Sequence, residues 1–209
     1  PDPHYLDIFT LRVSTASALL RAIHAPDQRL AAPSSGNSHG FRLVIVDDVF
    51  TPLVDIASTD QAGLIVPRIV NSNGSREDSV RWNLTPWSLL KRRLKRAGED
   101  NIDDGKFRWF AGMFYVVNSN VYRSVGGFDT RYFLYCEDYD LCARAHLAGH
   151  QMHLARHLQV IHDARRSSWK SRRYLAMHLK SLLRVWLSTP VWRIALRDLL
   201  ALPRRKTAH

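Results

Sequence analysis

The sequence predicts an α/β fold with a mixed, mainly parallel sheet, followed by basic amphipathic helices at the C-terminus. Two segments indicate the sheet, because Phe41–Val46 and Gly63–Val70 are almost entirely apolar, as parallel strands buried on both faces are. Helical spacing and turn residues alternate with such segments along the chain. Apolar residues make up 45% of the 209 residues, with only 10 Gly and 9 Pro, which excludes a disordered protein.

The first apolar strand, Phe41–Val46, runs directly into Asp47 and Asp48. A buried parallel strand would therefore deliver two carboxylates at its C-terminal end, where α/β proteins commonly bind ligands. An ordinary turn at the end of a strand explains the same pair. Composition and spacing predict three elements before this strand: a strand at Leu6–Val13, a short helix at Thr15–Ile23 and a loop at Ala31–Gly40.

The elements after the second strand are predicted in the same way. They are a turn at Asn71–Gly74, a basic helix at Trp87–Arg96, a polar loop at Ala97–Lys106, a third buried strand at Phe110–Val117, a turn at Gly126-Gly127, a helix at Tyr139–Ala148 closed by Gly149, and short strands at Gln151–Ala155 and Gln159–Ile161. The two cysteines, Cys136 and Cys142, match neither a disulfide framework nor a zinc half-site, which favours a reducing compartment.

Three carboxylates, Glu137, Asp138 and Asp140, lie within four positions at the predicted start of a helix. Capping explains this cluster when it is considered in isolation, because anionic side chains are favourable near the unpaired N–H groups of a helix N-terminus. Asp140 and Arg144 lie one helical turn apart and are predicted to form a supporting pair.

The residues around this acidic cluster form a longer pattern, which helix capping alone does not explain. It reads Gly126-Gly-Phe-Asp-Thr-Arg-Tyr-Phe-Leu-Tyr-Cys-Glu-Asp-Tyr-Asp-Leu-Cys142, with Ala148-Gly149 and then Ile161-His162 further along. From about Phe110 to Ser168 this pattern resembles the acceptor-side half of family 2 glycosyltransferases with the GT-A fold, especially bacterial rhamnosyltransferase-like members. A weaker match extends back to about Phe41. The resemblance implies a Rossmann-like nucleotide-diphospho-sugar transferase fold.

The resemblance also implies roles for the acidic residues. Asp138 would be the catalytic base, and Glu137 would orient the acceptor or raise the pKa of Asp138 through its neighbouring charge. Asp48 corresponds to the last Asp of the family's DxD-like motif, and His162 often completes that metal site. Together they would bind a divalent metal, Mg²⁺ or Mn²⁺.

Four further residues are implied to bind the donor: Asp47, Gly112, Arg165 and Arg166. Asp47 would stand in for the first motif position, which in this chain is Val46. Gly112 would let the donor sugar approach a bare backbone. Arg165 and Arg166 would hold phosphate oxygens from a loop that follows His162.

The implied activity is inverting, metal-dependent transfer of a sugar, possibly rhamnose, from a dTDP- or UDP-sugar to a bacterial surface glycan or a lipid-linked acceptor. The chain departs from the family at its N-terminal side, because only 46 residues precede Asp47 and the motifs that bind the nucleobase are not recognisable. The chain also begins with Pro, as a fragment or a processed protein does. Val46 at the first motif position and the missing N-terminal motifs favour the alternative of a non-catalytic, glycosyltransferase-like binding protein.

The charge of +11 is concentrated at the C-terminal side. Residues 164–209 contain 12 Lys and Arg and one acid, Asp198, whereas residues 1–163 contain 18 charges of each sign. We therefore expect a catalytic domain at 1–163, divided into a donor-side half (1–110) and an acceptor-side half (111–163), and a basic helical appendage at 164–209.

The appendage is predicted to form an amphipathic helix at Arg172–Leu187 and, after Pro190, a second segment at Val191–Leu202. No apolar run is long enough to span a bilayer. A basic helix of this kind suits an anionic membrane surface, which predicts a cytoplasmic protein that is peripheral on the inner membrane. Packing of the apolar face on the catalytic domain is the alternative. Nucleic-acid binding is not expected, because recognisable motifs for it are missing and only the charge favours it.

Overall fold

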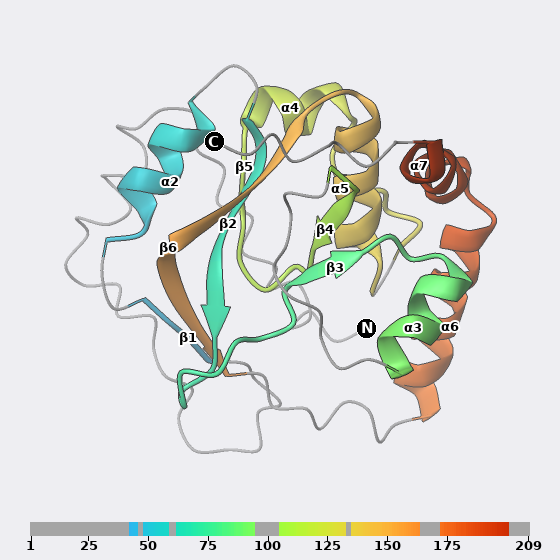
Figure 1. The fold of residues 1–209 in the computed structure, drawn as a ribbon, viewed down its shortest axis with the longest axis horizontal. Coiled ribbons are helices and arrows are strands. Elements are labelled where there is room, and N and C mark those ends of the chain that lie inside the picture. The colour runs from blue at the N-terminus through green and yellow to red at the C-terminus, as the bar shows by residue number, and fades with distance from the viewer. Residues whose placement is uncertain are drawn as a thin grey trace, which may run out of the picture.

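The computed structural model describes residues 42–45, 48–58, 62–94, 105–132, 135–163 and 172–200. The strand, helix and loop predicted before residue 41 lie outside these ranges, as does most of the predicted loop Ala97–Lys106. Within the described residues, strands and helices alternate around a central sheet, which confirms the α/β class (Figure 1).

The central sheet has four strands in the order β1-β6-β2-β5. Its long central pair is parallel and joins β2 (Ala62–Val70) to β6 (Gln151–Asp163). The short edge strands β1 (Arg42–Val44) and β5 (Val116–Val117) pair antiparallel with β6 and β2. The sheet is therefore mixed and parallel over its longest pair, and the predicted strand at Gly63–Val70 is confirmed. The strand predicted at Phe41–Val46 corresponds to β1 over Arg42–Val44, but the prediction that it is parallel was wrong, because β1 pairs antiparallel at the edge of the sheet.

Strand β6 unites two segments that the sequence predicted as separate strands. Ala155 pairs with Pro67, but Gln159 pairs with the next residue, Arg68, so three residues of β6 bulge out of the ladder. The prediction of two strands was wrong because the polar residues Arg156 and His157 interrupt the apolar pattern without ending the strand.

A two-stranded ribbon of β3 (Val80–Trp82) and β4 (Arg108–Phe110) lies beside this sheet. The prediction of one continuous strand at Phe110–Val117 was wrong, because a turn at Gly112 separates β4 from β5. The Gly112 N–H donates to the carboxylate of Asp138, at 2.8 Å, and so is not part of a strand ladder.

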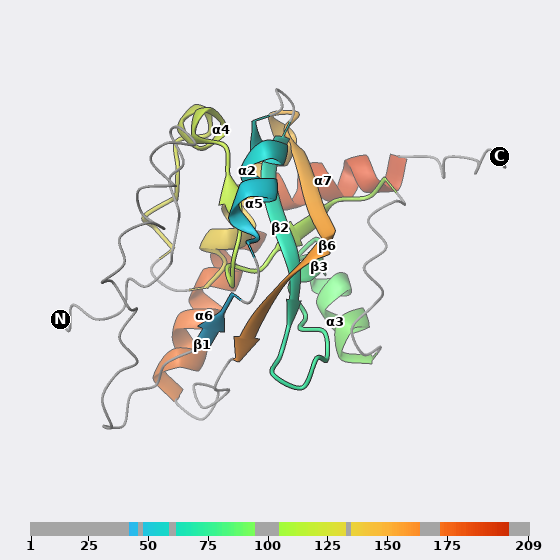
Figure 2. The same cartoon turned by 90° about the vertical axis from the view of Figure 1, so that its left-hand side faces the viewer.

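Six helices accompany the strands: α2 (Phe50–Ala57), α3 (Pro86–Leu94), α4 (Ser119–Ser124), α5 (Glu137–Leu147), α6 (Arg172–Trp186) and α7 (Thr189–Leu200). The helices predicted from spacing correspond to α3, α5, α6 and α7, whereas α2 and α4 were not predicted. Helix α2 covers one face of the sheet and α5 the other (Figure 1). Helices α3, α6 and α7 lie at the end of the molecule opposite α2 (Figure 1), with α6 and α3 on opposite sides of the central strands in the view of Figure 2.

Alternation along β2 fills both faces of the sheet. Leu64 and Val66 belong to the larger core, which packs around α5, and Ile65 and Ile69 belong to the smaller core under α2. Because apolar side chains are needed on both faces, β2 carries a continuous apolar run.

Helices α6 and α7 share the larger core. Val185, Val191 and Ile194 are fully buried in the same cluster as the side chains of α5. The boundary predicted between residues 163 and 164 falls next to 164–171, which lie outside the described residues. The division into domains stays a prediction, but α6 and α7, which follow the predicted boundary, pack in the same core as α5.

Candidate active site

The start of α5 is set by an unusual turn. Tyr135 and Cys136, directly before the helix, have φ angles of 65° and 68°, in the left-handed region that non-glycine residues rarely adopt. Such backbone conformations persist only where the surrounding structure imposes them, and they cluster at functional sites. Here the turn places Glu137 and Asp138 in the first turn of α5.

Asp138 connects this helix to the turn between β4 and β5. Its Oδ2 accepts a hydrogen bond from the Gly112 N–H at 2.8 Å, and its Oδ1 accepts one from the Tyr139 N–H at 2.7 Å. Burial raises the pKa of Asp138, while these two hydrogen bonds and the charge of Arg81 oppose the increase. The structure therefore brings together two residues that the sequence predicted for one site, Asp138 and Gly112.

Gly112 leaves open space beside that carboxylate. A Cβ atom at this position would lie 3.6 Å from Asp138 Oδ2, in ordinary contact, and the residue itself is exposed. A glycine thus keeps one side of the carboxylate accessible from solvent.

Glu137 is the second carboxylate of the pair. Burial, and then the charge of Asp138, raises the pKa of Glu137 to about 7. Its Oε2 is buried and has no hydrogen-bond partner among the described residues. Two adjacent carboxyl groups with raised pKa values suit proton transfer near neutral pH, and strongly perturbed groups of this kind are often functional.

Arg81, on β3, is a member of this site that sequence reasoning missed. Its Nε donates to the Asp78 carbonyl at 2.9 Å, and its guanidinium lies 5.1 Å from the ring centroid of Trp109. The side chain is largely buried, and its charge lowers the pKa of Asp138. The sequence feature that could have indicated this residue is an arginine between Val80 and Trp82, in a segment with strand propensity.

Helix α6 reaches the same site through His178. Its ring lies 4.7 Å from the ring of Tyr135 in a T-shaped arrangement. Burial, and then the charge of Arg81, lowers the pKa of His178. The predicted amphipathic helix therefore packs on the left-handed turn that precedes the two carboxylates.

Asp140 has a structural role, as predicted. Its Oδ2 lies 2.6 Å from Nη2 of Arg144, one helical turn further along α5. The same guanidinium donates to the carbonyl of Gly127 at 2.7 Å and to that of Val125. The pair thereby fixes the turn after α4, in which Gly126 and Gly127 adopt positive φ angles.

The residues predicted to bind metal lie on other elements. Asp48 is exposed, and its Oδ1 accepts hydrogen bonds from the N–H groups of Phe50 and Thr51 at the start of α2, at 3.0 and 3.1 Å. Hydrogen bonds from Thr51, and then from Phe50, lower the pKa of Asp48 despite a small opposing effect of burial. His162 is buried on β6, where it pairs in register with Leu43 of β1.

Among the residues that the structure describes, no three His, Cys, Asp or Glu side chains are grouped as ligands for a metal. Asp47, Arg165 and Arg166 lie outside the described ranges. The oxygen of Asp48 is of the type that Mg²⁺ and Mn²⁺ prefer. The metal and donor-binding assignments therefore stay predictions.

Comparisons with known proteins relate this chain to rhamnosyltransferases. It is 42% identical over 94 residues to rhamnosyltransferase WbbL of Escherichia coli K12, a match that covers 44% of this chain and 35% of that protein. It is 29% identical over 148 residues to N-acetylglucosaminyl-diphospho-decaprenol L-rhamnosyltransferase of Mycobacterium tuberculosis H37Rv, covering 62% of this chain and 47% of that protein.

No family model and no solved structure matches the chain. The chain spans between about a third and a half of the length of the curated relatives it matches. Over the matched residues it is similar to bacterial enzymes named as rhamnosyltransferases.

Proposed function

We propose that the chain is part of a glycosyltransferase of the GT-A type that transfers rhamnose from a nucleotide-sugar, dTDP- or UDP-linked, to a glycan or lipid-linked acceptor. The observation that carries this proposal is the half-buried Glu137–Asp138 pair, whose Asp138 carboxylate is held against Gly112. The similarity to named rhamnosyltransferases supports the choice of reaction. The α/β fold with its mixed sheet is consistent with the GT-A type.

In the proposed reaction the acceptor hydroxyl oxygen forms a bond to the anomeric carbon of the sugar. The bond from that carbon to the diphosphate oxygen breaks, and the nucleoside diphosphate leaves with the bonding electron pair. Attack from the face opposite the leaving group inverts the anomeric carbon. Asp138 accepts the hydroxyl proton, a role that its raised pKa suits, because a base with a pKa closer to the operating pH removes a proton more effectively.

Glu137 and Arg81 assist Asp138 in this proposal. Neutral below a pH of about 7, Glu137 can donate a hydrogen bond to the acceptor, and above that pH its carboxylate accepts one. The positive charge of Arg81 opposes the increase that burial causes in the pKa of Asp138 and so favours its ionised form.

For the donor we propose that Asp48 and His162 hold Mg²⁺ or Mn²⁺, and that Asp47, Arg165 and Arg166 contact the nucleotide and its phosphates. A divalent cation would supply neutralisation of the charge that develops on the departing diphosphate. Asp48 is exposed, so its carboxylate is open to a cation beside the hydrogen bonds that it accepts from α2.

A second candidate is a glycosyltransferase-like protein that binds a glycan or a partner transferase without turnover. The engagement of Asp48 in capping α2 favours it, since that residue already has a structural use. Binding of a nucleotide-sugar without transfer would distinguish this candidate from the enzyme.

We also propose that the protein acts at the cytoplasmic face of the inner membrane, with α6 against anionic lipid. Across the described ranges, no helix combines the length and the apolar character needed to cross a bilayer. The apolar residues of α6 divide between two environments: Leu182 is buried and Trp186 donates to the Leu84 carbonyl, whereas Leu175 and Leu179 are exposed. One part of α6 thus packs on the catalytic domain, while its exposed leucines are available to contact lipid.

The proposed base is tested with Asp138→Asn. An asparagine oxygen can still accept from Gly112, so the fold and the affinity for dTDP-rhamnose should change little, whereas the rate of rhamnose transfer should fall about 10²–10⁴-fold. Asp55→Asn, at an exposed carboxylate on α2, is the matched control. Transfer by Asp138→Asn at the parental rate would remove Asp138 from the mechanism.

A further inference from the structure

The exposed large apolar side chains of the described residues are confined to one end of the molecule. All of them belong to β3, α3, α6, α7 or the turn between the last two: Trp82, Trp87, Leu90, Leu175, Leu179, Leu183, Leu187, Trp192, Leu196, Leu199 and Leu200. We call the surface formed by α3, α6 and α7 the helical face (Figures 1 and 2). Exposed large apolar side chains concentrated at one end of a folded protein often mark an interaction site.

The helical face is also strongly basic. Helices α3, α6 and α7 contain three, four and two Lys or Arg residues, and Asp198 is their only acid. Exposed leucine and tryptophan side chains between basic ones are the composition of helices that lie in the interface of an anionic bilayer.

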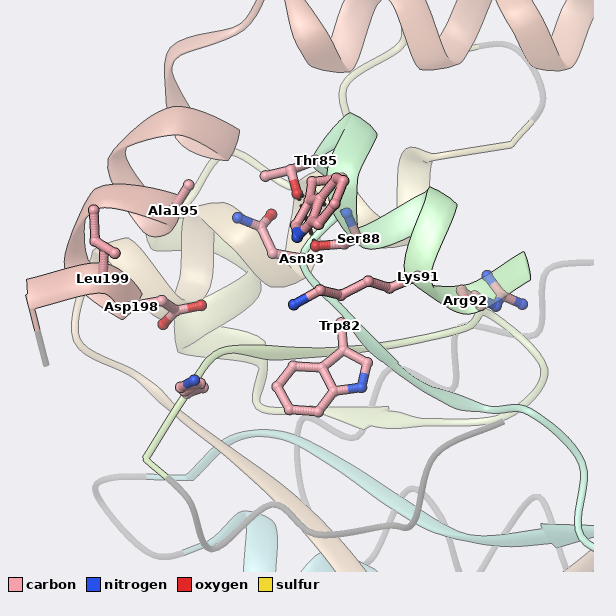
Figure 3. A pocket seen from close by; sticks show the side chains of 11 residues that line it. Trp82, Asn83, Thr85, Ser88, Lys91, Arg92, Ala195, Asp198 and Leu199 are labelled. Carbon is pink, nitrogen blue, oxygen red and sulfur yellow. Dashed lines mark hydrogen bonds between the residues drawn. The ribbon is translucent and has the colours of Figure 1, made fainter. Parts of the chain in front are cut away.

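A cavity of about 490 Å³ opens on this face between α3, α7 and the end of β3 (Figure 3). Its walls include Trp82 and Trp87, and its cations are Lys91, Arg92 and Lys106. Arg108 lies over the Trp82 ring, with its guanidinium carbon 3.1 Å from the ring centroid, and so adds positive charge behind that wall. Asp198 is the one carboxylate of the lining.

Most polar groups of the lining already have partners within the protein. Asn83 donates to the Val191 carbonyl at 3.0 Å and accepts from the Tyr139 hydroxyl at 2.6 Å. The hydroxyls of Thr85 and Ser88 bond to each other at 2.7 Å. Asp198 accepts from the Phe107 N–H at 3.1 Å. These groups shape the cavity, in whose described lining Lys91, Arg92 and Lys106 outnumber the single carboxylate of Asp198.

Lys91 is placed to contact that ligand. Its amine points into the cavity in Figure 3 and lies 5.6 Å from the centroid of the Trp87 ring. Arg92, by contrast, is paired with Asp78 at the rim. A lysine amine beside an indole suits a phosphate group whose organic part packs on the ring.

We propose that this cavity binds the phosphate headgroup of an anionic bilayer lipid, with Lys91 and Lys106 contacting the phosphate and Trp82 and Trp87 packing on the glycerol and the first carbons of the chains. Leu199, which lines the cavity and is exposed, would then lie among the acyl chains. A bilayer lipid is favoured over a soluble anion because the cavity opens within an apolar surface, which a soluble anion would not cover.

This inference rests on the proposed location at a membrane and is independent of the proposed transfer reaction. It differs from simple adsorption of basic helices, because a defined cavity should be required in addition to charge. The two can be separated by changes that fill the cavity without altering the charge of the face.

The test measures co-sedimentation of the whole chain with vesicles of phosphatidylglycerol and phosphatidylcholine, and with phosphatidylcholine alone. Ala195→Phe places a ring in the cavity, and Ala176→Phe adds the same ring at an exposed position of α6. We expect Ala195→Phe to weaken binding to the anionic vesicles and Ala176→Phe to leave it unchanged or stronger. Thermal melting of both variants checks that they are folded.

A charge variant provides a second measurement. Lys91→Glu reverses one charge in the cavity and should weaken vesicle binding by about fivefold to thirtyfold at moderate salt. Arg123→Glu makes the same change at an exposed position on α4, away from the helical face, and should have a much smaller effect. Lys91 is exposed, so this variant should fold even if Ala195→Phe does not.

The possible outcomes separate the proposals. If the parent ignores anionic vesicles, the membrane location fails and this inference fails with it, while rhamnose transfer is still open to test. If the parent binds and Ala195→Phe and Lys91→Glu bind equally well, the cavity does not hold a headgroup. Excess glycerol phosphate should compete with the vesicles only weakly, because it lacks the acyl chains; binding of free glycerol phosphate as tight as that of the vesicles would overturn the choice of a bilayer lipid.

Discussion

Replacing Glu137 with glutamine should stabilise the protein, and the gain should grow as the pH rises. The carboxyl group of Glu137 has a pKa of about 7 in the folded chain, because it is buried beside Asp138, against an ordinary value of 4.5. In the unfolded chain the group ionises near its ordinary value. At low pH both states carry a neutral carboxyl group, so glutamine and glutamic acid differ little there.

As the pH rises above 4.5, the unfolded state ionises first and the folded state holds one proton more. Stability of the parent therefore falls until the pH passes about 7, where both states are ionised and the loss becomes constant. A raised pKa of this size corresponds to about 3 kcal/mol. Glutamine cannot ionise, so the free energy of unfolding of Glu137→Gln should exceed that of the parent by an amount that increases to about this value.

Urea unfolding of both proteins, followed by tryptophan fluorescence at several pH values between about 5 and 8, measures this difference. Subtracting the free energy of unfolding of the parent from that of the variant at each pH removes the contributions of the other titrating groups. Asp55→Asn, at an exposed carboxylate on α2, is the control and should give a difference that stays flat with pH. A flat difference for Glu137→Gln as well would show that this carboxyl group is not perturbed by burial.

Three further predictions concern the neighbourhood of this pair and the donor side. Gly112→Ala should fold normally but lose most rhamnose transfer, because its methyl group would lie 3.6 Å from Asp138 Oδ2; normal transfer would show that the acceptor approaches from elsewhere. Asp48→Asn and His162→Ala should each weaken nucleotide binding measured calorimetrically with Mn²⁺ but not with EDTA, whereas equal parental affinities under both conditions would argue against a metal. Trp186→Phe should lower the free energy of unfolding by about 1 kcal/mol, because the hydrogen bond from its indole to the backbone is lost; an unchanged urea midpoint would contradict this.

Local patterns predicted the elements that carry the proposed chemistry. The acidic cluster does begin a helix, and the pair formed by Asp140 and Arg144 follows directly from helical spacing. The apolar run of β2 likewise needed no knowledge of its neighbours. Each of these features depends on residues that are close in the sequence.

The surroundings of Asp138 could not be predicted in the same way, because they depend on contacts between distant segments. Arg81 reaches the site from a strand of three residues, which is too short to give a periodic signal. The turn at Gly112 was hidden inside an apolar segment whose pattern fits a strand, and its hydrogen bond to Asp138 spans 26 positions. The contact of His178 with Tyr135 joins two segments that are far apart in the sequence, so no local pattern predicts it.

The bulge in β6 has a consequence for how this chain tolerates insertions and deletions. The three residues between Ala155 and Gln159 are extra to the ladder, because Ala155 and Gln159 pair with the neighbouring residues Pro67 and Arg68 of β2. Ala155 and Val160 therefore lie in the same core under α2, although an uninterrupted strand would place residues five positions apart on opposite faces. A deletion inside the bulge removes extra residues and leaves the pairing on either side in register, whereas a deletion inside a paired segment shifts the register and moves side chains onto the opposite face of the sheet. We therefore expect a library of single deletions to be tolerated better at residues 156–158 than at residues 151–155.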